Sequence, residues 1–261
     1  MRKRKTYSSK NIKEIYDYHF RKTIIKGKGR AKKQNVTKEE VARYNDRKAE
    51  AELRLTLDNN FKANDYYITT TFKEDVGIET AYELYRKFTR KLRDLYRKKK
   101  VPKPKYIYVC EGKRRIHFHM ILGKEFDISV EEFESIWPHG YIEVVAYHGK
   151  AEDAIKLASY FLKEKRAVFY REKEGEDAKK FKKRWVTSRG NLELPKEETK
   201  TLKYSEWRDD IKAPKGYCLD KESVIEGVNP AGYQYRFYRL IKLDPIQEVY
   251  KKGKTRVKRN E

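Results

Sequence analysis

The chain has 261 residues, of which 40% are charged and 38% hydrophobic, and it carries a formal net charge of +24 at pH 7. This length suits one large domain or one domain with substantial extensions. No apolar run approaches the ~18 residues of a membrane-spanning helix, so we expect no membrane span. The large positive excess repels itself in the folded state and therefore favours a polyanionic partner.

Aromatic residues make up 13% of the chain, which has 21 tyrosines. Rings interleaved with Lys and Arg suit single-stranded nucleic acid, because bases stack on the rings while the cations follow the phosphates. A solvated, lysine-rich surface without a polyanion is the alternative. Charge and aromatic content together predict a nucleic-acid-binding protein.

The two cysteines, Cys110 and Cys218, have no CxxC spacing and offer neither a zinc ribbon nor a disulfide framework. The basic N-terminus MRKRKTYSSK is not followed by an apolar stretch, so it is not a secretory signal. A reducing, cytoplasmic location fits both observations. Cys110 lies in an apolar run, and we expect it to be buried.

The first part of the chain has two different patterns. Residues 1–36 are basic, with KGKGRAKK at 26–33, and indicate a flexible arm. Thr37 followed by Glu40 is a capping-box signature, which predicts a helix that ends near Phe61.

Strand and helix patterns alternate from residue 66 onward. Residues 79–100 carry apolar side chains at helical spacing opposite a basic face, and the sequence VPKP ends this helix. A shorter helix begins at Ser129, which Glu132 follows at capping-box distance. In chain order we expect a strand at 66–72, the helix at 79–100, strands at 106–111 and 116–122, a helix at 129–137, a strand at 141–147 and a helix at 151–165.

Residues 66–147 thus follow the order β-α-β-β-α-β. This is the order of the split βαβ, ferredoxin-like fold, an α+β architecture with one antiparallel sheet. We expect helices on one face of that sheet and a second face free for a ligand. Beyond residue 166 the patterns weaken, so the C-terminal extension is expected to be mixed.

Two of the five histidines lie one residue apart in the strand IHFHMIL. Side chains alternate along a strand, so His117 and His119 share one face, ~7 Å apart, while the apolar residues between them face the helices. The pair therefore points to the open face. Ordinary surface or half-buried strand histidines are the alternative to a functional pair.

A carboxylate on the preceding strand fits the histidine pair. If residues 112–116 form the loop between the strands, Glu111 pairs opposite His117 on the same face. Two imidazoles and a carboxylate, with positions left for water and phosphate, suit a divalent ion such as Mg²⁺ or Mn²⁺.

The helix at 151–165 carries an apolar stripe, and Tyr160, Lys156 and Lys163 lie together on its opposite side. With a pKa of ~10, a tyrosine is normally no nucleophile. Beside lysines and a metal-polarised phosphate it gains that ability, which is the basis of covalent catalysis. A tyrosine that only packs its ring at a helix surface is the alternative.

Three motifs in fixed order resemble the HUH endonucleases, the rolling-circle replication initiators of phages, plasmids and small circular genomes. The resemblance covers roughly residues 37–243 and is greatest to the filamentous-phage gene II type of initiator and its relatives in Gram-positive phages and integrative elements. The motifs are YYITTTF (66–72), His117-Phe118-His119 and Tyr160-Phe161-Leu162-Lys163, and IWPHGYIEV (136–144), TSRGNLELP (187–195) and VIEGVNPAGYQYRFYR (224–239) are also similar.

The resemblance implies a site-specific nickase of single-stranded DNA. His117 and His119, with Glu111 as third ligand, would hold the divalent metal against the scissile phosphate. Tyr160 would attack that phosphate, leaving a 5′-phosphotyrosine and a free 3′-OH. Lys163 would help to orient the metal-bound phosphate or stabilise the charge that develops there. The DNA-binding residues would be Lys113, Arg114 and Arg115 in the loop before the histidines, together with Lys156.

The resemblance also implies partners and domains. The DNA would be a single-stranded or hairpin origin in a bacterial host cytoplasm. No Walker A sequence is present, so unwinding and synthesis would depend on a host helicase and polymerase. The expected parts are a basic arm at 1–36, an endonuclease domain with its N-terminal helix at 37–165, an accessory DNA-binding extension at 166–250 and a basic tail at 251–261.

Two other functions remain open from the sequence. A relaxase or single-tyrosine transposase would use the same motifs and chemistry. A non-enzymatic RRM-like module has the same β-α-β-β-α-β order and a basic charge, but it would carry aromatic residues where this chain has His117 and His119.

Overall fold

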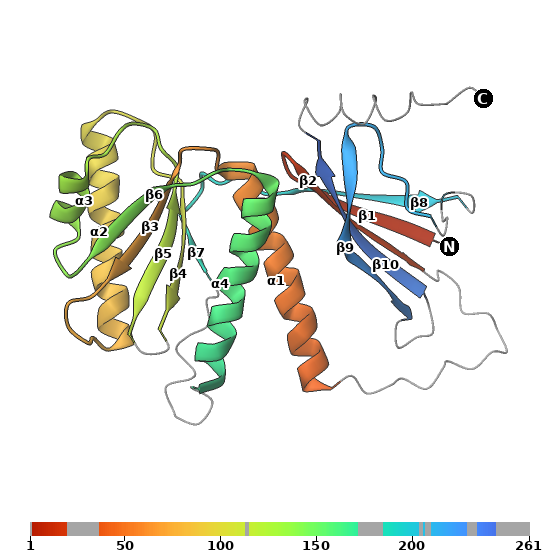
Figure 1. Ribbon diagram of the computed structural model, residues 1–261, viewed down its shortest axis with the longest axis horizontal. Helices are drawn as coiled ribbons and strands as arrows, with labels where there is room; N and C mark the ends of the chain where they lie inside the picture. Colours follow the sequence, from red (N-terminus) through yellow and green to blue (C-terminus); the bar gives the residue numbers. More distant parts are fainter. Residues whose placement is uncertain are drawn as a thin grey trace, which may run out of the picture. The chain divides into compact units, whose positions relative to one another are not determined.

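The computed structural model describes residues 2–19, 37–112, 115–171, 185–203, 206, 210–228 and 234–243. For residues 38–41, 163–171 and 228 it describes only the backbone. Within these residues the protein is an α+β structure with four helices and two five-stranded antiparallel sheets (Figure 1). The α+β class expected from the sequence is confirmed.

The chain divides into two compact units. One unit comprises Thr56–Leu194, and the other combines Met1–Leu55 with Pro195–Glu261. The long helix α1 (Lys38–Asn60) contributes to both units, because the boundary falls within it. The second unit therefore combines segments from the first and last parts of the sequence, which the sequence analysis had assigned to a separate arm and extension.

The sheet of the Thr56–Leu194 unit has the strand order β6-β3-β5-β4-β7, with β3 and β5 at its centre. Each strand and helix of the expected β-α-β-β-α-β series is present, within a few residues of its predicted bounds. The strands are β3 (Tyr66–Thr71), β4 (Tyr106–Glu111), β5 (His117–Leu122), β6 (Ile142–Ala146) and β7 (Val186–Thr187).

Helices α2 (Ile78–Lys98) and α3 (Val130–Ile136) cover one face of this sheet. The helical spacing of apolar residues in α2 buries Tyr85, whose ring stacks on Phe118 of β5 with the ring centroids 3.9 Å apart. Helix α3 begins with the predicted capping box, in which the Ser129 side chain accepts from the Glu132 backbone N–H and Glu132 accepts from that of Ser129. Cys110 is buried in the same core, as expected.

Helix α4 (Ala151–Arg171) packs against the opposite face of the sheet. Its residues Ala154, Ala158 and Phe161 are fully buried. The expectation of a helix-free face is therefore wrong. The physical reason is that the apolar stripe of α4 needs a partner, and Ile107 on that sheet face, which is also fully buried, offers apolar surface to cover.

The second unit contains a sheet with the order β8-β1-β2-β10-β9. The flexible arm expected at 1–36 is wrong for residues 2–19, which form a hairpin, while residues 20–36 lie outside the described part. Basic residues of β1 are accommodated because acidic partners lie opposite, as where Arg4 donates to Asp17 through two contacts of 2.6 and 2.8 Å. The strands are β1 (Arg2–Ser8), β2 (Ile12–His19), β8 (Lys196–Leu202), β9 (Tyr217–Val228) and β10 (Gln234–Lys242).

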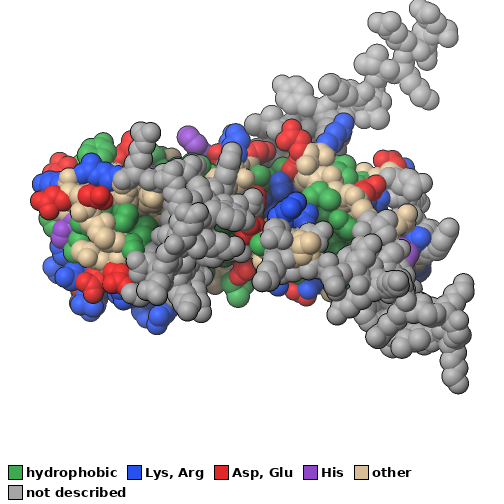
Figure 2. All heavy atoms as spheres, turned by 90° about the horizontal axis from the view of Figure 1, so that it is seen from below, with side chains coloured by type: hydrophobic (Ala, Val, Ile, Leu, Met, Phe, Trp, Pro, Cys, Tyr) green, Lys and Arg blue, Asp and Glu red, His purple; other side chains and the backbone are tan. Residues whose placement is uncertain are grey.

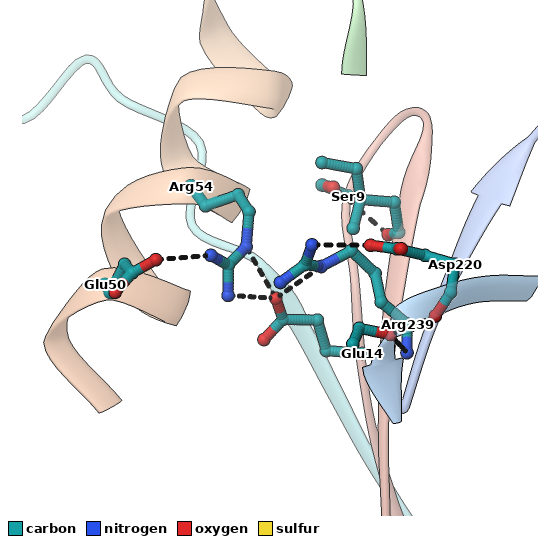
Figure 3. A network of polar contacts seen from close by, with 8 residues as sticks. Ser9, Glu14, Glu50, Arg54, Asp220 and Arg239 are labelled. Atoms are coloured by element: carbon teal, nitrogen blue, oxygen red, sulfur yellow. Dashed lines mark hydrogen bonds and ion pairs between the residues drawn. The ribbon is translucent and has the colours of Figure 1, made fainter. Parts of the chain in front are cut away.

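A buried ion network joins α1 to this second sheet (Figure 3). Glu14 of β2 is 1% exposed and accepts from Arg54 of α1 at 2.7 Å and from Arg239 of β10 at 3.4 Å. Arg54 also pairs with Glu50, and Arg239 with Asp220 of β9. One carboxylate thus holds two buried guanidinium groups, each with a second acidic partner.

Charges of both signs are mixed on the surface. On the described part of the face drawn in Figure 2, Lys and Arg side chains (blue) lie near Asp and Glu side chains (red), with apolar side chains (green) between them. The positive excess of the chain is therefore not one uninterrupted basic patch on that face. Within the described residues, no helix has the length and apolar character needed to cross a bilayer.

Replacing Glu14 by Ala should strongly destabilise the unit that contains β1, β2 and β10. The change leaves Arg54 and Arg239 buried without their shared partner, and breaking a buried ion network in this way costs roughly 3–5 kcal/mol. Urea unfolding followed by circular dichroism measures the loss. Glu197→Ala is the matched control, because Glu197 pairs with Lys5 at the surface, and such a pair contributes less than about 1 kcal/mol. Equal losses in the two variants would contradict the proposed importance of the buried network.

Candidate active site

Strands β4 and β5 bring Glu111, His117 and His119 to one face of the sheet. In the antiparallel pair Glu111 lies directly opposite His117, and Val109 lies opposite His119. The predicted pairing of Glu111 with His117 is therefore confirmed. Because side chains alternate, the intervening Phe118 points to the opposite face and is fully buried in the core beneath α2.

The side chains of these residues converge on one point. Glu111 Oε2 lies 3.4 Å from His117 Nε2 and 3.5 Å from His119 Nε2. The possible ligand atoms all lie within 4.8 Å of one another, and no other group of this kind occurs within the described residues. This Glu-His-His cluster could bind a metal ion.

Two polar atoms of the cluster are buried without a hydrogen-bond partner in the described structure. They are Glu111 Oε1 and His119 Nε2. Leaving a buried polar atom unpaired costs about 1–3 kcal/mol, so such atoms call for an explanation. An ion bound by the carboxylate and the imidazoles would satisfy both atoms, and the mixed N and O donor set suits divalent transition metals as well as Mg²⁺.

The Glu111 carboxyl is held ionised by its neighbours. Burial by itself would raise its pKa, but its contacts with His117 and His119 outweigh burial, so the pKa lies below the ordinary value. At neutral pH the site therefore presents a negative charge to a cation although Glu111 is only 4% exposed.

Neighbouring groups orient both imidazole rings. His117 Nδ1 lies 3.0 Å from the Arg115 carbonyl oxygen, which can only accept, so Nδ1 carries a proton. A second proton on Nε2 would be donated to Glu111 and lower its pKa, whereas the neutral ring, which is the form that binds a metal, has its Nε2 lone pair on the side of Glu111. His119 Nδ1 lies 2.9 Å from the Tyr67 hydroxyl and 3.2 Å from that of Thr69. In the tautomer with a proton on Nδ1, His119 donates to these hydroxyls and also directs its Nε2 lone pair at Glu111.

Sequence reasoning assigned no role to Tyr67 and Thr69, although it identified their strand. Tyr67 also stacks on His119, with the ring centroids 5.7 Å apart and the planes at 16°. Burial, together with nearby Tyr160 and Glu111, raises the pKa of Tyr67, so its hydroxyl stays protonated. The signal that could have found these residues is the alternation of YYITTTF, which puts 67 and 69 on one face.

Helix α4 brings Tyr160 to the cluster. The Tyr160 hydroxyl lies 3.3 Å from Glu111 Oε2 and donates to it, and the Tyr160 ring lies 5.8 Å from that of His119. The next residue, Phe161, is fully buried against the sheet, so Tyr160 lies at the edge of the packed stripe and remains 43% exposed. The structure thus brings the predicted nucleophile and the predicted ligands together while leaving the tyrosine accessible.

Residues 65–165 match a family model of replication-associated proteins, that of the ORF2 and gene II protein type. The match runs from the residue before β3 into α4 and includes the whole Glu-His-His cluster and Tyr160. It confirms the resemblance to replication initiators of this type. Neither a comparison with curated proteins nor one with solved structures gives a significant match.

The structure describes some, but not all, of the predicted basic residues in the segment that matches this replication-associated family. Lys156 is exposed on α4 and borders a pocket beside Tyr160. Arg115 donates to the Lys73 carbonyl oxygen, while its own carbonyl orients His117. The Lys163 side chain, and Lys113 and Arg114 altogether, lie outside the described part of the chain.

Titration of the protein with Mn²⁺ should reveal one site that depends on this cluster. Glu111→Gln and His119→Ala each remove a ligand and should abolish measurable binding, whereas Tyr67→Phe should weaken binding about tenfold because it removes only an orienting contact. Calorimetry or electron paramagnetic resonance of free Mn²⁺ measures the affinity.

Binding of Mn²⁺ should also weaken in acid, because protons compete with the metal for the imidazole lone pairs. His148→Ala is the control, since His148 is exposed and lies outside the cluster. Unchanged Mn²⁺ affinity in Glu111→Gln would refute the assignment of the ligands.

Proposed function

We propose that the protein is a site-specific endonuclease and strand transferase for single-stranded DNA, which initiates rolling-circle replication of a phage, plasmid or integrative element. The observation that supports this proposal most directly is the hydrogen bond from the Tyr160 hydroxyl to Glu111 of the Glu-His-His cluster. The match of this same segment to a replication-associated family supports it.

The reaction would be an exchange of one phosphodiester bond for another. Tyr160 Oη forms a bond to the scissile phosphorus, and the bond from phosphorus to the 3′ oxygen of the preceding nucleotide breaks. The electron pair of the broken bond stays with the 3′ oxygen, which takes up a proton, while the tyrosine loses its own. The products are a 5′-phosphotyrosine and a 3′-OH, and the reverse attack by a 3′-OH joins the strand again.

Glu111 is positioned for two tasks in this reaction. Its Oε2 accepts the Tyr160 hydroxyl proton in a hydrogen bond, which orients Oη and favours its deprotonation. Together with His117 and His119 it would hold Mg²⁺ or Mn²⁺. A divalent ion there supplies Lewis-acid polarisation of a phosphate oxygen. Lys163 and Lys156 are proposed to balance the phosphate charge from α4.

The strand order supports a ferredoxin-like core for this activity. The order β6-β3-β5-β4, with α2 between β3 and β4 and α3 between β5 and β6, is that of a split βαβ pair. An RRM-like binding module has less support, because α4 covers part of the face on which such a module binds RNA, and polar ligands replace its stacking rings. A relaxase or single-tyrosine transposase would use the same residues.

We propose that the protein acts on a single-stranded or hairpin origin in a bacterial host cytoplasm, with a host helicase and polymerase completing replication. The unit that contains β1, β2 and β8–β10 would assist in binding the origin DNA. The net charge of +24 supports a DNA partner, and affinity for DNA should accordingly fall with salt.

Tyr160→Phe should abolish covalent attachment to DNA while leaving DNA affinity within about twofold, because it removes the nucleophile but keeps the ring. The substrates are single-stranded oligonucleotides tiled across the DNA that flanks the coding sequence, incubated with Mn²⁺. Denaturing electrophoresis detects the protein–DNA adduct, and mass spectrometry identifies the modified residue.

Tyr141→Phe is the matched control, since Tyr141 is 67% exposed and lies outside the cluster. It should form the adduct at the wild-type rate. An adduct that persists in Tyr160→Phe would rule out Tyr160 as the nucleophile, and full cleavage in EDTA would rule out the metal.

A further inference from the structure

An open pocket of about 410 Å³ lies beside Tyr160. One wall comes from strands β3 and β6, where Val145 lies directly opposite Tyr67 in the antiparallel pair. The other wall comes from α4, where Leu157 and Tyr160 are separated by one helical turn and lie on the same side. Ala146 of β6 also lines the pocket.

The walls of this pocket are apolar and exposed, which is unusual in a chain that is 40% charged. Val145 is 46% and Tyr160 43% exposed. Tyr147 and His148, which follow β6, and two charged residues of α4, Asp153 and Lys156, complete the lining. A pocket with aromatic and aliphatic walls and a few polar groups is typical of a site for a small flat ligand.

Two pocket residues also belong to the candidate active site. The Tyr67 hydroxyl contacts His119, and the Tyr160 hydroxyl contacts Glu111. A DNA strand with a phosphate at the Glu-His-His cluster therefore has a neighbouring nucleotide next to the pocket. The ligand must be part of a strand that is already unpaired there, because a base within a duplex has no free face to offer.

We infer that the pocket holds one unstacked nucleobase of the cleaved strand, adjacent to the scissile phosphate; this inference rests on the proposed function. A base has apolar faces that suit Tyr67, Val145 and Leu157, and a polar edge that suits Asp153 and Lys156. The pocket volume is at the lower end of the ~300–1,000 Å³ typical of ligand sites, so it suits one nucleoside rather than a stack of several. Base selection next to the nick would then depend on β6 and α4, neither of which supplies a metal ligand.

Photo-crosslinking of the full chain tests the pocket without requiring cleavage. The probe is a short oligothymidine in which 5-iodouracil replaces some thymines, because iodouracil crosslinks to aromatic rings that contact it. We expect crosslinks to Tyr67, Tyr147 or Tyr160, mapped by mass spectrometry. Val145→Trp fills the pocket, because Val145 lies opposite Tyr67 on the pocket face and is 46% exposed. It should remove these crosslinks and weaken oligothymidine binding at least about fivefold, the lower end of what one stacked base contributes.

Val130→Trp is the matched control, because Val130 is 58% exposed on α3, which covers the opposite face of the sheet. It should keep both the crosslinks and the affinity, and thermal unfolding should show that both variants fold. Crosslinks that Val145→Trp leaves unchanged, or that map only elsewhere, would overturn the pocket assignment.

The same samples separate this inference from the proposed function. With Mn²⁺ and flanking-DNA oligonucleotides, wild-type protein that crosslinks at the pocket but forms no adduct would refute nicking and retain the base site. An adduct that forms at the wild-type rate and with wild-type sequence preference in Val145→Trp would retain nicking and refute the base site.

Discussion

The register of β4 against β5 is the constraint on which the candidate site depends. Because Glu111 is paired with His117, the carboxylate and both imidazoles lie on one face of the sheet and reach a common point. A slip of one residue in either strand would turn its polar side chains towards the core beneath α2. The aromatic packing of Phe118 against Tyr85 therefore does more than stabilise the unit, since it fixes which face the two histidines occupy.

The covering helix α4 gives this face its chemical character. Its buried Phe161 lies against His119 and excludes water from one side of the cluster, while the adjacent Tyr160 remains accessible. Charges interact more strongly where water is excluded, so a cation held by Glu111 would be held more firmly than by an exposed carboxylate. The same helix thus supplies apolar cover and a reactive hydroxyl from successive residues, which a helix can do because neighbouring side chains point about 100° apart.

The sequence predicted the candidate site more completely than it predicted the overall fold. Strand alternation and loop length were enough to bring Glu111, His117 and His119 together, because local geometry determines which side chains share a face. Alternation also predicts that Tyr67 and Thr69 share one face of their strand. Their contact with His119, however, depends on β3 lying next to β5, which is a long-range pairing. The cover by α4 and the hairpin at residues 2–19 were missed for a related reason. A basic strand looks like a flexible arm until its acidic partner, here Asp17 for Arg4, is known.

The pairing of β2 with β10 has a consequence for how the protein is made. Glu14 and Arg239, which meet in the buried network, are 225 residues apart in the chain. During synthesis the hairpin of β1 and β2 therefore has one edge of β2 unpaired until β10 has emerged. The Thr56–Leu194 unit is complete much earlier, and domains generally fold as they are synthesised. Folding of that unit first removes most of the freedom of the intervening chain, which lowers the entropy lost when the two ends finally join.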